Sequence, residues 1–537
     1  MRTDAKIRVL LLPILVAMAS CGGGGGGGSG SSGSGGGFSS SGGGSSTGWT
    51  SGVFQPSANF DAMCVNPRAG TSDRQGTRTD ENNWLRSWSN ELYLWYGEIT
   101  DRNPALYTSS LDYFDVLRTT ATTASGADKD KFHFTYDTDD WQALSTGGTE
   151  AGYGAEFFIQ NGPAPTYVPR RIVVAFTDPN TPAAAQLQRG DEVLQVDGAD
   201  AVNGNTQALV NTLNNGLFPS ATGQTHTFQV RSAAGVTRSV SITSATITHT
   251  PVPIATTFAS ASGPVGYIQF NDHIATAETP LINAINTVKN AGATDLILDI
   301  RYNGGGYLDL ASELAYMLGN TTLTAGRTFE KIVFNDKNPT RDPVTGELLT
   351  PTPFWTKTQG FTGGAPANQT LPSLNLNRVY IITGPGTCSA SESIINSLRG
   401  VNVEVYLIGS TTCGKPYGFY PTDNCGTTYF TIQFRGENAA NFGDYTDGFS
   451  PANTPTSSKG TSVPGCSVAD DFTHAMGDAT EGRIAAALAF RASNNQTCPT
   501  ASGTSAPRVA KMSNGLVEGY GLAVSKPAAR SNRILRY

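Results

Sequence analysis

The sequence predicts a multidomain α+β protein, because three stretches of the chain differ in their hydrophobic periodicity. Residues 81–95 carry tryptophans at helical spacing, residues 148–248 read as short strands, and residues 265–409 alternate strands with helices. A chain of 537 residues is long enough for two to four domains. We therefore expect a small helical N-terminal domain, a β-rich domain and a larger, partly parallel αβ core.

The first 21 residues have the pattern of an export signal. A basic start precedes an apolar run that is too short to span a membrane, and small residues stand directly before Cys21. This pattern resembles a bacterial lipobox, which implies cleavage before Cys21 and lipidation of that residue. An ordinary secretory signal is the alternative, and in both cases the mature protein leaves the cytoplasm.

Residues 22–48 are nearly all Gly and Ser, a composition that forms a flexible tether rather than a core. Gly22 stands where an Asp would favour retention at the inner membrane of enteric bacteria. We therefore expect a lipid anchor in the outer membrane of a bacterial cell envelope, with the protein facing the periplasm. The domains that we expect after the tether are 49–147 (helical), 148–248 (β-rich), 249–500 (αβ core) and 501–537 (a flexible basic tail).

Composition and cysteine usage exclude some classes of function. The net charge of -7 and the absence of a basic stripe argue against nucleic-acid binding. Cys-x-x-Cys pairs and Cys/His clusters are absent, so we expect no metal and no cofactor. Six cysteines besides Cys21 allow three disulfides in 15 pairings. A bridge between Cys388 and Cys413 is one hypothesis, and Cys413–Cys425 is its rival; the other cysteines are Cys64, Cys466 and Cys498.

Several elements can be placed along the chain from periodicity alone. In the N-terminal region we expect helices from Glu81 and over 110–118. In the β-rich region we expect a helix at 206–213. In the core, we expect strands at 265–270, 295–301, 379–383, 403–409 and 427–434, with helices at 276–290, 308–318, 389–398 and 479–492.

The β-rich segment carries the run GDEVLQVDG at 190–198. With its neighbouring strands this segment resembles a PDZ domain; a generic β-rich module is the alternative. In PDZ domains a Gly-rich loop presents backbone N–H groups to a peptide's terminal carboxylate, and the peptide adds as a strand. The resemblance implies that Gly152, Tyr153, Gly154 and Ala155 form this loop and bind substrate tails.

Ser389 stands between a predicted strand and a predicted helix. It follows the apolar run 379–383 and a Gly-Pro-Gly turn, and the helix opens directly after it. Backbone N–H groups at such a helix start lack intrahelical partners and could stabilise an oxyanion. The alternative is a structural role, because Ser389 and Glu392 also have the spacing of a capping box.

Two further segments are expected beside Ser389, at the ends of neighbouring strands. The glycines at 304–306 let backbone N–H groups approach a substrate closely, and Lys415 supplies an amine from a Gly-flanked loop. A serine needs a base within reach to attack an amide. A lysine can serve when burial disfavours its ammonium form. A structural lysine on an exposed loop is the alternative.

Together, DIRYNGGG at 299–306, CSASE at 388–392 and GK at 414–415, downstream of a PDZ-like segment, resemble the carboxyl-terminal processing (tail-specific) serine peptidases. The resemblance implies a ClpP/crotonase-like core and a Ser/Lys endopeptidase that cleaves unfolded or tail-exposing exported proteins. It also implies residue roles, with Ser389 as nucleophile, Lys415 as general base, and Ala390 and Gly305 as oxyanion-hole donors.

The chain departs from the family pattern at several positions. Phe419 stands where the family has a Gln that orients the lysine, and Gly304 replaces a Pro. A long insertion separates Met317 from Val379. Something else must therefore hold the lysine, and the candidates are Tyr417, Tyr420 and Asp423.

Three alternatives stay open at this point. Ser391 is a fallback nucleophile. The chain could instead be an inactive relative that acts as a PDZ peptide-binding scaffold, for which the missing Gln is the best support. It could also be a hydrolase that uses a histidine as base, with His133 as the first candidate among His133, His226, His249, His273 and His474.

Overall fold

The structure is a computed structural model that describes residues 49–456, 460–503, 522–524 and 533–534. The predicted signal with Cys21, the Gly/Ser tether and most of the predicted tail lie outside the described residues. In the described part of the chain, no helix has both the length and the apolar character needed to cross a membrane.

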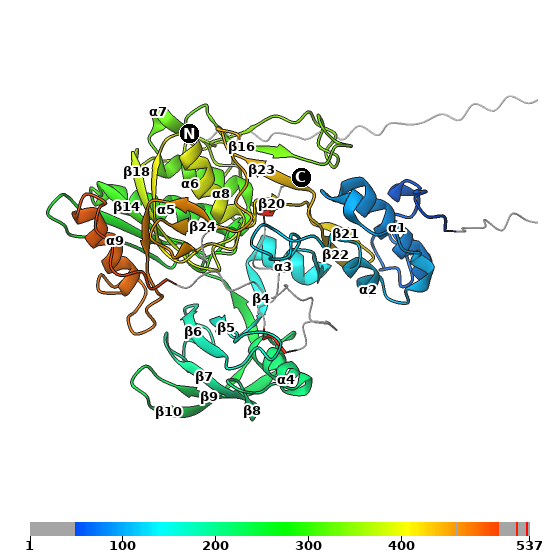
Figure 1. The fold of residues 1–537 in the computed structure, drawn as a ribbon, viewed down its shortest axis with the longest axis horizontal. Coiled ribbons are helices and arrows are strands. Elements are labelled where there is room, and N and C mark those ends of the chain that lie inside the picture. Colours follow the sequence, from blue (N-terminus) through cyan, green and yellow to red (C-terminus); the bar gives the residue numbers. More distant parts are fainter. Residues whose placement is uncertain (1–48, 457–459, 504–521, 525–532, 535–537) are drawn as a thin grey trace, which may run out of the picture. The chain divides into compact units, whose positions relative to one another are not determined.

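The N-terminal region is built around one aromatic helix (Figure 1). Thr77 caps this helix with Asp80, so it begins three residues before the predicted start at Glu81 and ends before Trp95. Trp84 and Trp88 stack with ring centroids 5.1 Å apart and pack against the later helix. The helices here are α1 (Arg78–Leu92), α2 (Ser110–Asp115, shorter than predicted) and α3 (Thr138–Gly147), with 3-10 turns η1 (Ser57–Asn59), η2 (Tyr96–Glu98) and η3 (Pro104–Leu106) and strands β1 (Met63–Cys64) and β2 (Arg74–Gln75).

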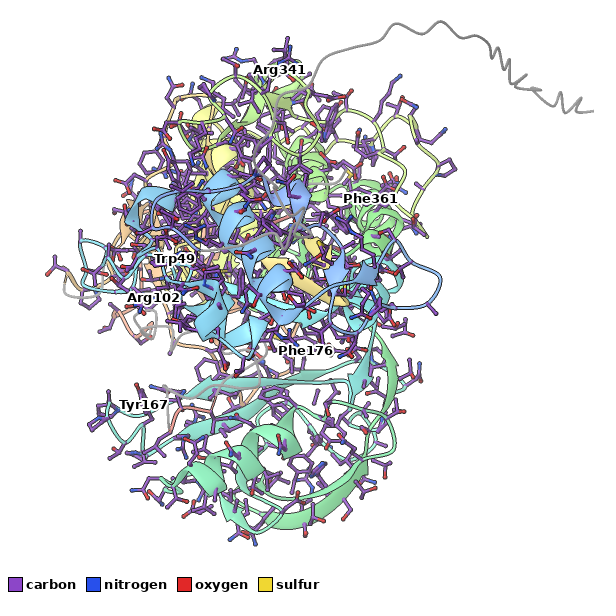
Figure 2. All side chains as sticks on the ribbon, turned by 90° about the vertical axis from the view of Figure 1, so that its right-hand side faces the viewer. Trp49, Arg102, Tyr167, Phe176, Arg341 and Phe361 are labelled. Carbon is purple, nitrogen blue, oxygen red and sulfur yellow. A yellow bond between two sulfur atoms is a disulfide. The ribbon has the colours of Figure 1, made fainter. Side chains whose placement is uncertain are left out.

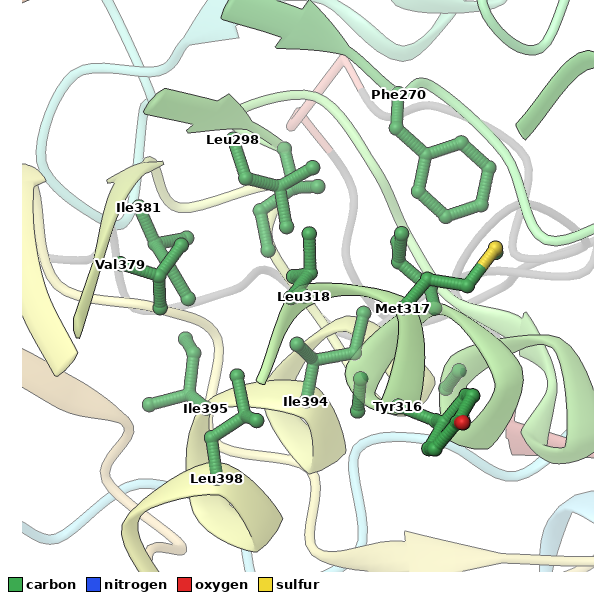
Figure 3. Packing of buried hydrophobic residues seen from close by; sticks show 14 of the residues in the cluster. Phe270, Leu298, Tyr316, Met317, Leu318, Val379, Ile381, Ile394, Ile395 and Leu398 are labelled. Carbon is green, nitrogen blue, oxygen red and sulfur yellow. The ribbon is translucent and has the colours of Figure 1, made fainter. Parts of the chain in front are cut away.

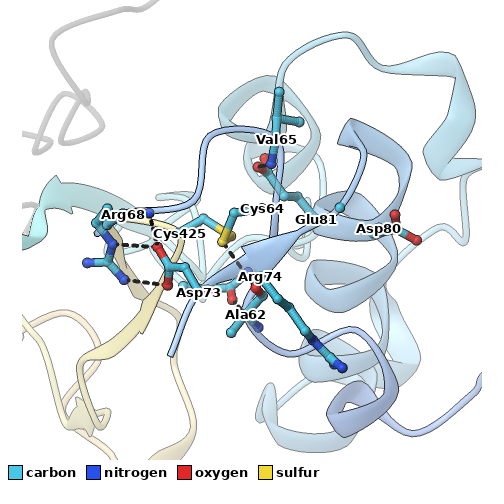
Figure 4. Close-up of a disulfide and its surroundings, with 12 residues drawn as sticks. Ala62, Cys64, Val65, Arg68, Asp73, Arg74, Asp80, Glu81 and Cys425 are labelled. Carbon is cyan, nitrogen blue, oxygen red and sulfur yellow. Dashed lines mark hydrogen bonds and ion pairs between the residues drawn. A yellow bond between two sulfur atoms is a disulfide. The ribbon is translucent and has the colours of Figure 1, made fainter. Parts of the chain in front are cut away.

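This region is joined to the core by a strand and a disulfide. Strand β3 (Phe134–Asp137) pairs with β22 (Thr427–Phe430), which also pairs with β21 (Thr422–Asn424). Cys64 is bonded to Cys425 at the turn between β21 and β22 (Figure 4). Tyr429 of β22 packs into the aromatic cluster of α1 and α2. The helical region therefore shares its packing with the chain that follows Lys415.

The β-rich segment forms an antiparallel sheet with the strand order β10-β9-β7-β6-β5, in which β8 pairs with β7. Helix α4 (Gln207–Leu217) packs on it, and the two share an apolar core with Phe157 and Phe228. Two paired strands, β4 and β11, lead into and out of this sheet. The strands are β4 (Thr149–Gly152), β5 (Ala155–Gln160), β6 (Arg171–Thr177), β7 (Glu192–Val196), β8 (Ala199–Asp200), β9 (Thr225–Arg231), β10 (Thr237–Thr243) and β11 (Ala245–Thr248).

The core sheet has the order β12-β13-β14-β18-β19-β26, parallel except for β12. Along β18, Val379 and Ile381 face one helical layer, while Tyr380 and Ile382 face the other, as the two-residue repeat of a strand requires. Figure 3 shows the first of these layers, where α8 residues Ile394 and Leu398 pack beneath the sheet. The strands are β12 (Ile254–Phe258), β13 (Val265–Gln269), β14 (Asp295–Asp299), β18 (Arg378–Thr383), β19 (Glu404–Gly409) and β26 (Gly465–Ser467).

Helices α5, α6 and α8 cover one face of this sheet and α9 covers the other. Because both faces are buried, the central strands are continuous apolar runs. Helix α9 begins three residues later than predicted, since Glu481 caps it by accepting from Ile484 N. The helices are α5 (Glu278–Asn290, preceded by the 3-10 turn η4, Ala275–Ala277), α6 (Leu308–Leu318), α8 (Ala390–Gly400) and α9 (Gly482–Ala492).

A second small sheet carries the chain beyond Lys415. Its order is β17-β16-β23-β20, and the long insertion supplies two of its strands. The predicted strand 427–434 is wrong in one respect, because the chain leaves β3 after Phe430 and pairs with β16 and β20 only from Phe434. The elements are α7 (Thr321–Thr324), β16 (Thr328–Val333), β17 (Thr352–Pro353), β20 (Tyr417–Gly418) and β23 (Phe434–Glu437), with β24 (Phe449–Pro451) and β25 (Thr461–Val463) paired nearby.

The sheet of the β-rich segment contacts the core near the C-terminal end of β6. Phe176, labelled in Figure 2, has its ring centroid 5.8 Å from that of Tyr302 in the core. Arg189 donates to the Tyr302 hydroxyl at 2.9 Å and to Asp470 at 2.9 Å. A Cβ at Gly190 would lie 2.2 Å from Phe472 O, so the Gly of the GD motif permits this close approach.

Candidate active site

The three predicted segments follow adjacent parallel strands. The Gly-rich turn follows β14, Ser389 follows β18, and Lys415 follows β19, and these strands are neighbours in the sheet. Their backbones are bonded to one another, with Cys388 N donating to Asn303 O at 3.1 Å and Cys413 N to Thr387 O at 3.0 Å. The carboxyl edge of a parallel sheet is where such folds build ligand sites.

Ser389 has an unusual backbone conformation. Its φ of 62° and ψ of -119° place a non-glycine residue in the left-handed half of conformational space. Such strained strand-to-helix turns persist where the surrounding structure enforces them, as in the nucleophile elbow of other hydrolases. The side chain is buried, and its Oγ has no hydrogen-bond partner among the described residues. Glu392 accepts from Ser389 N at the start of α8, as the predicted capping box requires.

Glu392 binds the nucleophile turn to the lysine loop. Its carboxylate accepts from Ser389 N at 3.0 Å, and from Gly414 N and Lys415 N, both at 2.8 Å. The Thr412 hydroxyl also donates to it, at 2.5 Å. Complete burial raises the pKa of this carboxyl, and the four donors oppose that rise. The sequence indicated Glu392 only as a capping partner, because the donors from the lysine loop are more than 20 residues away.

A disulfide joins the same two segments. Cys388 is bonded to Cys413, which confirms the first pairing hypothesis, and Cys413–Cys425 is wrong because Cys425 pairs with Cys64. The third bridge is Cys466–Cys498. Cys388, Glu392 and Cys413 lie close enough to hold a metal ion, but both thiols are oxidised and offer no thiolate ligands.

Lys415 is buried between aromatic rings. The Nζ atom lies 4.5 Å from the ring centroid of Phe419 and 4.9 Å from that of Phe132. Phe419, which stands where the family has Gln, therefore packs directly on the amine. Two of the residues predicted to hold the lysine bond to other groups. The Tyr420 hydroxyl donates to Asp342, and Asp423 accepts from Arg68 and Thr138. Tyr417 packs edge-on against Trp95.

A second buried lysine lies beside the site. Lys131 Nζ donates to Cys413 O at 3.0 Å, and burial lowers the pKa of this amine. Its neighbour Asp130 is also buried, accepts from the Tyr93 hydroxyl at 2.7 Å, and has a pKa raised by burial. Neither residue has a distinctive sequence context, so sequence analysis missed them.

In the Gly-rich turn, the predicted oxyanion donor Gly305 N is bonded to a side chain of the same turn. Gly305 N donates to Asn303 Oδ1 at 2.9 Å, and His273 Nδ1 donates to the same oxygen at 2.9 Å. Asn303 Nδ2 donates to Phe270 O, which fixes the orientation of the amide. In this conformation the Gly305 N–H is therefore already occupied. Ala390, the other predicted donor, begins α8, where N–H groups lack intrahelical partners.

No histidine contacts the Ser389 hydroxyl, because that atom has no partner in the described chain. His133 bonds to Phe114 O at 2.8 Å and to the Thr431 hydroxyl at 3.1 Å. Burial lowers the pKa of His133 and of His273 to about 3. The remaining histidines are paired with carboxylates elsewhere: His226 with Asp197, His249 with Asp178, and His474 with Asp471.

Ser391, the fallback nucleophile, uses its hydroxyl structurally. Its Oγ donates to Asn303 O at 3.0 Å. The neighbouring motif residues Asp299 and Arg301 are also structural. The Arg301 guanidinium is fully buried and bonds Asp299, Asp470 and Glu481. This ionic cluster supports the base of the Gly-rich turn.

The predicted carboxylate-binding loop runs from the end of β4 to the start of β5. Gly154 has a φ of +75°, and a Cβ there would meet Thr181 at 2.5 Å. The carbonyls of Tyr153 and Gly154 accept from Ala183 N and Asp178 N. The Tyr153 hydroxyl donates to Gly216 O at 3.0 Å, which ties the loop to the end of α4. The loop is therefore positioned on three sides by this small sheet and its helix.

Comparisons with known proteins agree with these motifs. Residues 264–419 match the model of peptidase family S41. A carboxyl-terminal-processing protease from Picosynechococcus is 25% identical over 280 residues, which are 51% of this chain and 56% of the relative. Carboxyl-terminal-processing peptidase 1, chloroplastic, of Arabidopsis thaliana is 27% identical over 242 residues, 43% of this chain and 41% of the relative. The chain thus matches about half the length of these curated relatives.

Among solved structures, a Bacteroides fragilis protein assigned to the S41 proteases has a similar fold. The TM-score is 0.52 at 20% identity, over 77% of this chain and 98% of that chain. The matched region 264–419 contains the Gly-rich turn, Ser389 and Lys415. Over this region the chain is therefore similar to peptidase family S41, a family of serine peptidases.

Proposed function

We propose that the protein is a serine endopeptidase that cleaves exported proteins through Ser389 and Lys415. The observation that carries the proposal is the Ser389 turn, a strained non-glycine conformation whose backbone is bonded, through Glu392, to the backbone of Lys415. A capping serine needs neither the strain nor the link. A nucleophile needs both, because its hydroxyl must project from the turn and its base must be held nearby.

In the proposed reaction, the Lys415 amine takes the proton of the Ser389 hydroxyl as Oγ attacks the peptide carbonyl carbon. The carbonyl oxygen becomes an oxyanion that the Ala390 N–H and a turned-out Gly305 N–H would stabilise. The C–N bond then breaks, and Lys415 returns the proton to the leaving amine. Water attacks the acyl-enzyme in the same way, and Ser389 is restored.

Recognition of substrate tails by the PDZ-like sheet is part of the proposal. Strand β5 is the last strand in the sheet order, so its outer edge can accept an added strand. The loop 152–155 stands at the start of β5 and would meet the terminal carboxylate. The substrates are therefore unfolded or tail-exposing proteins, bound by their main chain.

We also propose a place outside the cytoplasm. The three disulfides are of the kind that form and persist in oxidising compartments. A lipid on Cys21 would hold the protein at the outer membrane, facing the periplasm. Cys21→Ser should then move the protein from the membrane fraction to the soluble fraction, and unchanged fractionation would contradict the anchor.

The test of the catalytic assignment is hydrolysis of an unstructured protein by the mature chain and four variants. Ser389→Ala and Lys415→Ala should lower the rate by roughly a thousandfold or more, because members of a catalytic unit fail together. Ser391→Ala should retain activity. Lys131→Ala separates the two buried amines, and a loss confined to that variant would make Lys131 the base.

Two outcomes would favour the alternatives. Activity that survives both lysine variants would favour a histidine base, although no histidine bonds to the Ser389 hydroxyl among the described residues. A folded chain that binds unstructured peptides but hydrolyses none, also with added envelope extract, would favour the binding scaffold.

A further inference from the structure

Two short pieces of the C-terminal tail lie near the surfaces that the proposed function assigns to substrate. Residues 522–524 lie on the PDZ-like sheet, and strand β27 (Arg533–Ile534) lies at the candidate active site. Both pieces appear in red in Figure 1, one beside α4 and the other beside β20. The sequence predicts only a poorly ordered tail here, and the described pieces differ from that expectation.

The first piece is held mainly through its backbone. Asn161, directly after β5, donates from Nδ2 to Val524 O at 3.0 Å and accepts from Val524 N at 3.2 Å. This side-chain amide therefore pairs with one residue of the tail as a neighbouring strand would. Arg170 donates to Leu522 O at 2.6 Å. Val524 itself is 1% exposed and belongs to the apolar core of the PDZ-like sheet.

The second piece lies beside two strands of the candidate active site, β15 and β20. Strand β27 pairs in parallel with β15 (Gly306–Tyr307), with Gly306 opposite Arg533 and Tyr307 opposite Ile534. It also lies against β20, which begins two residues after Lys415. Strand β27 is therefore near both the end of the Gly-rich turn and the start of the strand beyond the lysine.

In the structure with β27 beside the Gly-rich turn, the candidate site is not arranged for catalysis as proposed. The Gly305 N–H, adjacent to the paired residue Gly306, is bonded to Asn303 Oδ1, and Ser389 Oγ has no partner in the described chain. The turn would have to rotate before Gly305 could stabilise an oxyanion. The tail therefore pairs with Gly306, and the neighbouring Gly305 N–H bonds to Asn303 within the same short loop.

We propose that the tail pieces at 522–524 and 533–534 act as a built-in competitive ligand, which lies at the substrate-binding surfaces at rest and must be displaced by a polypeptide substrate. This inference rests on the proposed function. The two anchors are nine positions apart in the sequence, so the tail is tethered beside its binding surface. Short tethers give effective concentrations in the millimolar range, so weak backbone contacts suffice to exclude dilute substrate.

The proposal is tested on the full mature chain with Asn161→Ala, which removes the amide that pairs with Val524, and with Ile534→Pro, which disfavours a strand at β27. Asn203→Ala is the matched control, an exposed asparagine of the same small domain that makes no side-chain contact with the tail. Hydrolysis of an unstructured protein should rise about tenfold in the first two variants and stay unchanged in the control.

A second readout does not depend on activity. In the Ser389→Ala background, amide hydrogen exchange at 306–307 and 417–418 should be faster in Asn161→Ala and Ile534→Pro than in the parent chain. A synthetic peptide of residues 519–537 should slow it again and inhibit the activated variants, whereas a scrambled peptide should not.

The two hypotheses fail in distinguishable ways. An active wild-type chain with unchanged rates and unchanged exchange in both variants would overturn the tail as a ligand. Faster exchange with no hydrolysis in any variant would support tail docking and contradict the peptidase.

Discussion

The two walls of the candidate site are held with different firmness. The dyad wall (residues 387–392 and 411–415) is closed by the Cys388–Cys413 bridge and by four donors to Glu392. In the glycine wall (residues 303–306 with His273), the Gly305 N–H and His273 Nδ1 share one acceptor, Asn303 Oδ1. The dyad wall is thus preorganised, whereas the glycine wall can exchange one hydrogen bond for another. If the proposed function holds, we expect substrate to rearrange the glycine wall and to leave Ser389 and Lys415 in place.

The largest effect should come from removing the carboxylate that holds the dyad wall. Glu392→Ala leaves three backbone N–H groups buried without an acceptor and separates the Ser389 and Lys415 backbones. We expect a loss of activity of about a hundredfold or more, since misplacement by 1 Å can cost that much. Glu392→Gln, of similar shape, should recover part of the activity. Equal rates for the Ala variant and the wild type would show that the wall is held without this carboxylate.

Opening the covalent link should weaken the same wall less. The bridge closes a loop of 25 residues, so the double variant Cys388→Ser, Cys413→Ser should lose about 3 kcal/mol of unfolding free energy. Urea unfolding with and without reductant measures this loss. Activity should fall in the wild type on reduction and be insensitive to reductant in the double variant. If reductant changes the activity of neither protein, Glu392 alone is enough to hold the dyad wall.

Acid should test the glycine wall through His273, and His133 is a second buried histidine outside both walls. His273 in the glycine wall and His133 behind Phe132 have pKa values lowered from 6.5 to about 3 by burial. The unfolded chain therefore binds more protons between pH 3 and 6.5, so stability is full above pH 6.5 and is lost as pH falls. Each histidine should contribute about 1.4 kcal/mol per pH unit.

His273→Gln should remove one of these two slopes. Urea unfolding at several pH values between 7 and 4.5 compares the variant with the wild type, so that other titrating groups cancel. Both proteins retain Glu313, whose pKa burial raises to about 9. This group makes stability fall as pH rises above 4.5, opposite to the histidines, and it cancels in the comparison. Identical slopes in the two proteins would contradict the assignment of His273 as a buried neutral group.

The smallest effect should come from the contact between the PDZ-like sheet and Tyr302 and Asp470 of the core. Arg189→Met removes the bonds to Tyr302 and Asp470 and should cost roughly 1–2 kcal/mol, while changing peptidase activity more than stability. The control Arg231→Met breaks an exposed pair with Glu192 in the same sheet and should cost less than about 1 kcal/mol. Equal effects of the two variants on activity would mean that this contact only docks the sheet.

Much of the architecture could be predicted because it depends on local periodicity. The central strands are continuous apolar runs, and the three motifs follow strands that prove to be neighbours. The Cys64–Cys425 bridge could not be predicted, since spacing does not choose among 15 pairings. The role of Glu392 was hidden because its local pattern is that of a capping box. The inward turn of Gly305 and the pairing of β27 depend on contacts between distant segments, which periodicity does not encode.

The Cys64–Cys425 bridge has a mechanical consequence. Its ends are 361 positions apart, and Cys64 is only 15 residues from the start of the described chain at Trp49. A stretching force applied to the two ends of the chain would pass through this covalent bond and bypass the residues between Cys64 and Cys425. The PDZ-like sheet and most of the core would then carry no load. Reduction of this bridge alone should lengthen the fully extended chain by about 3.5 Å for each released residue, roughly 1,200 Å in all while Cys388–Cys413 stays closed.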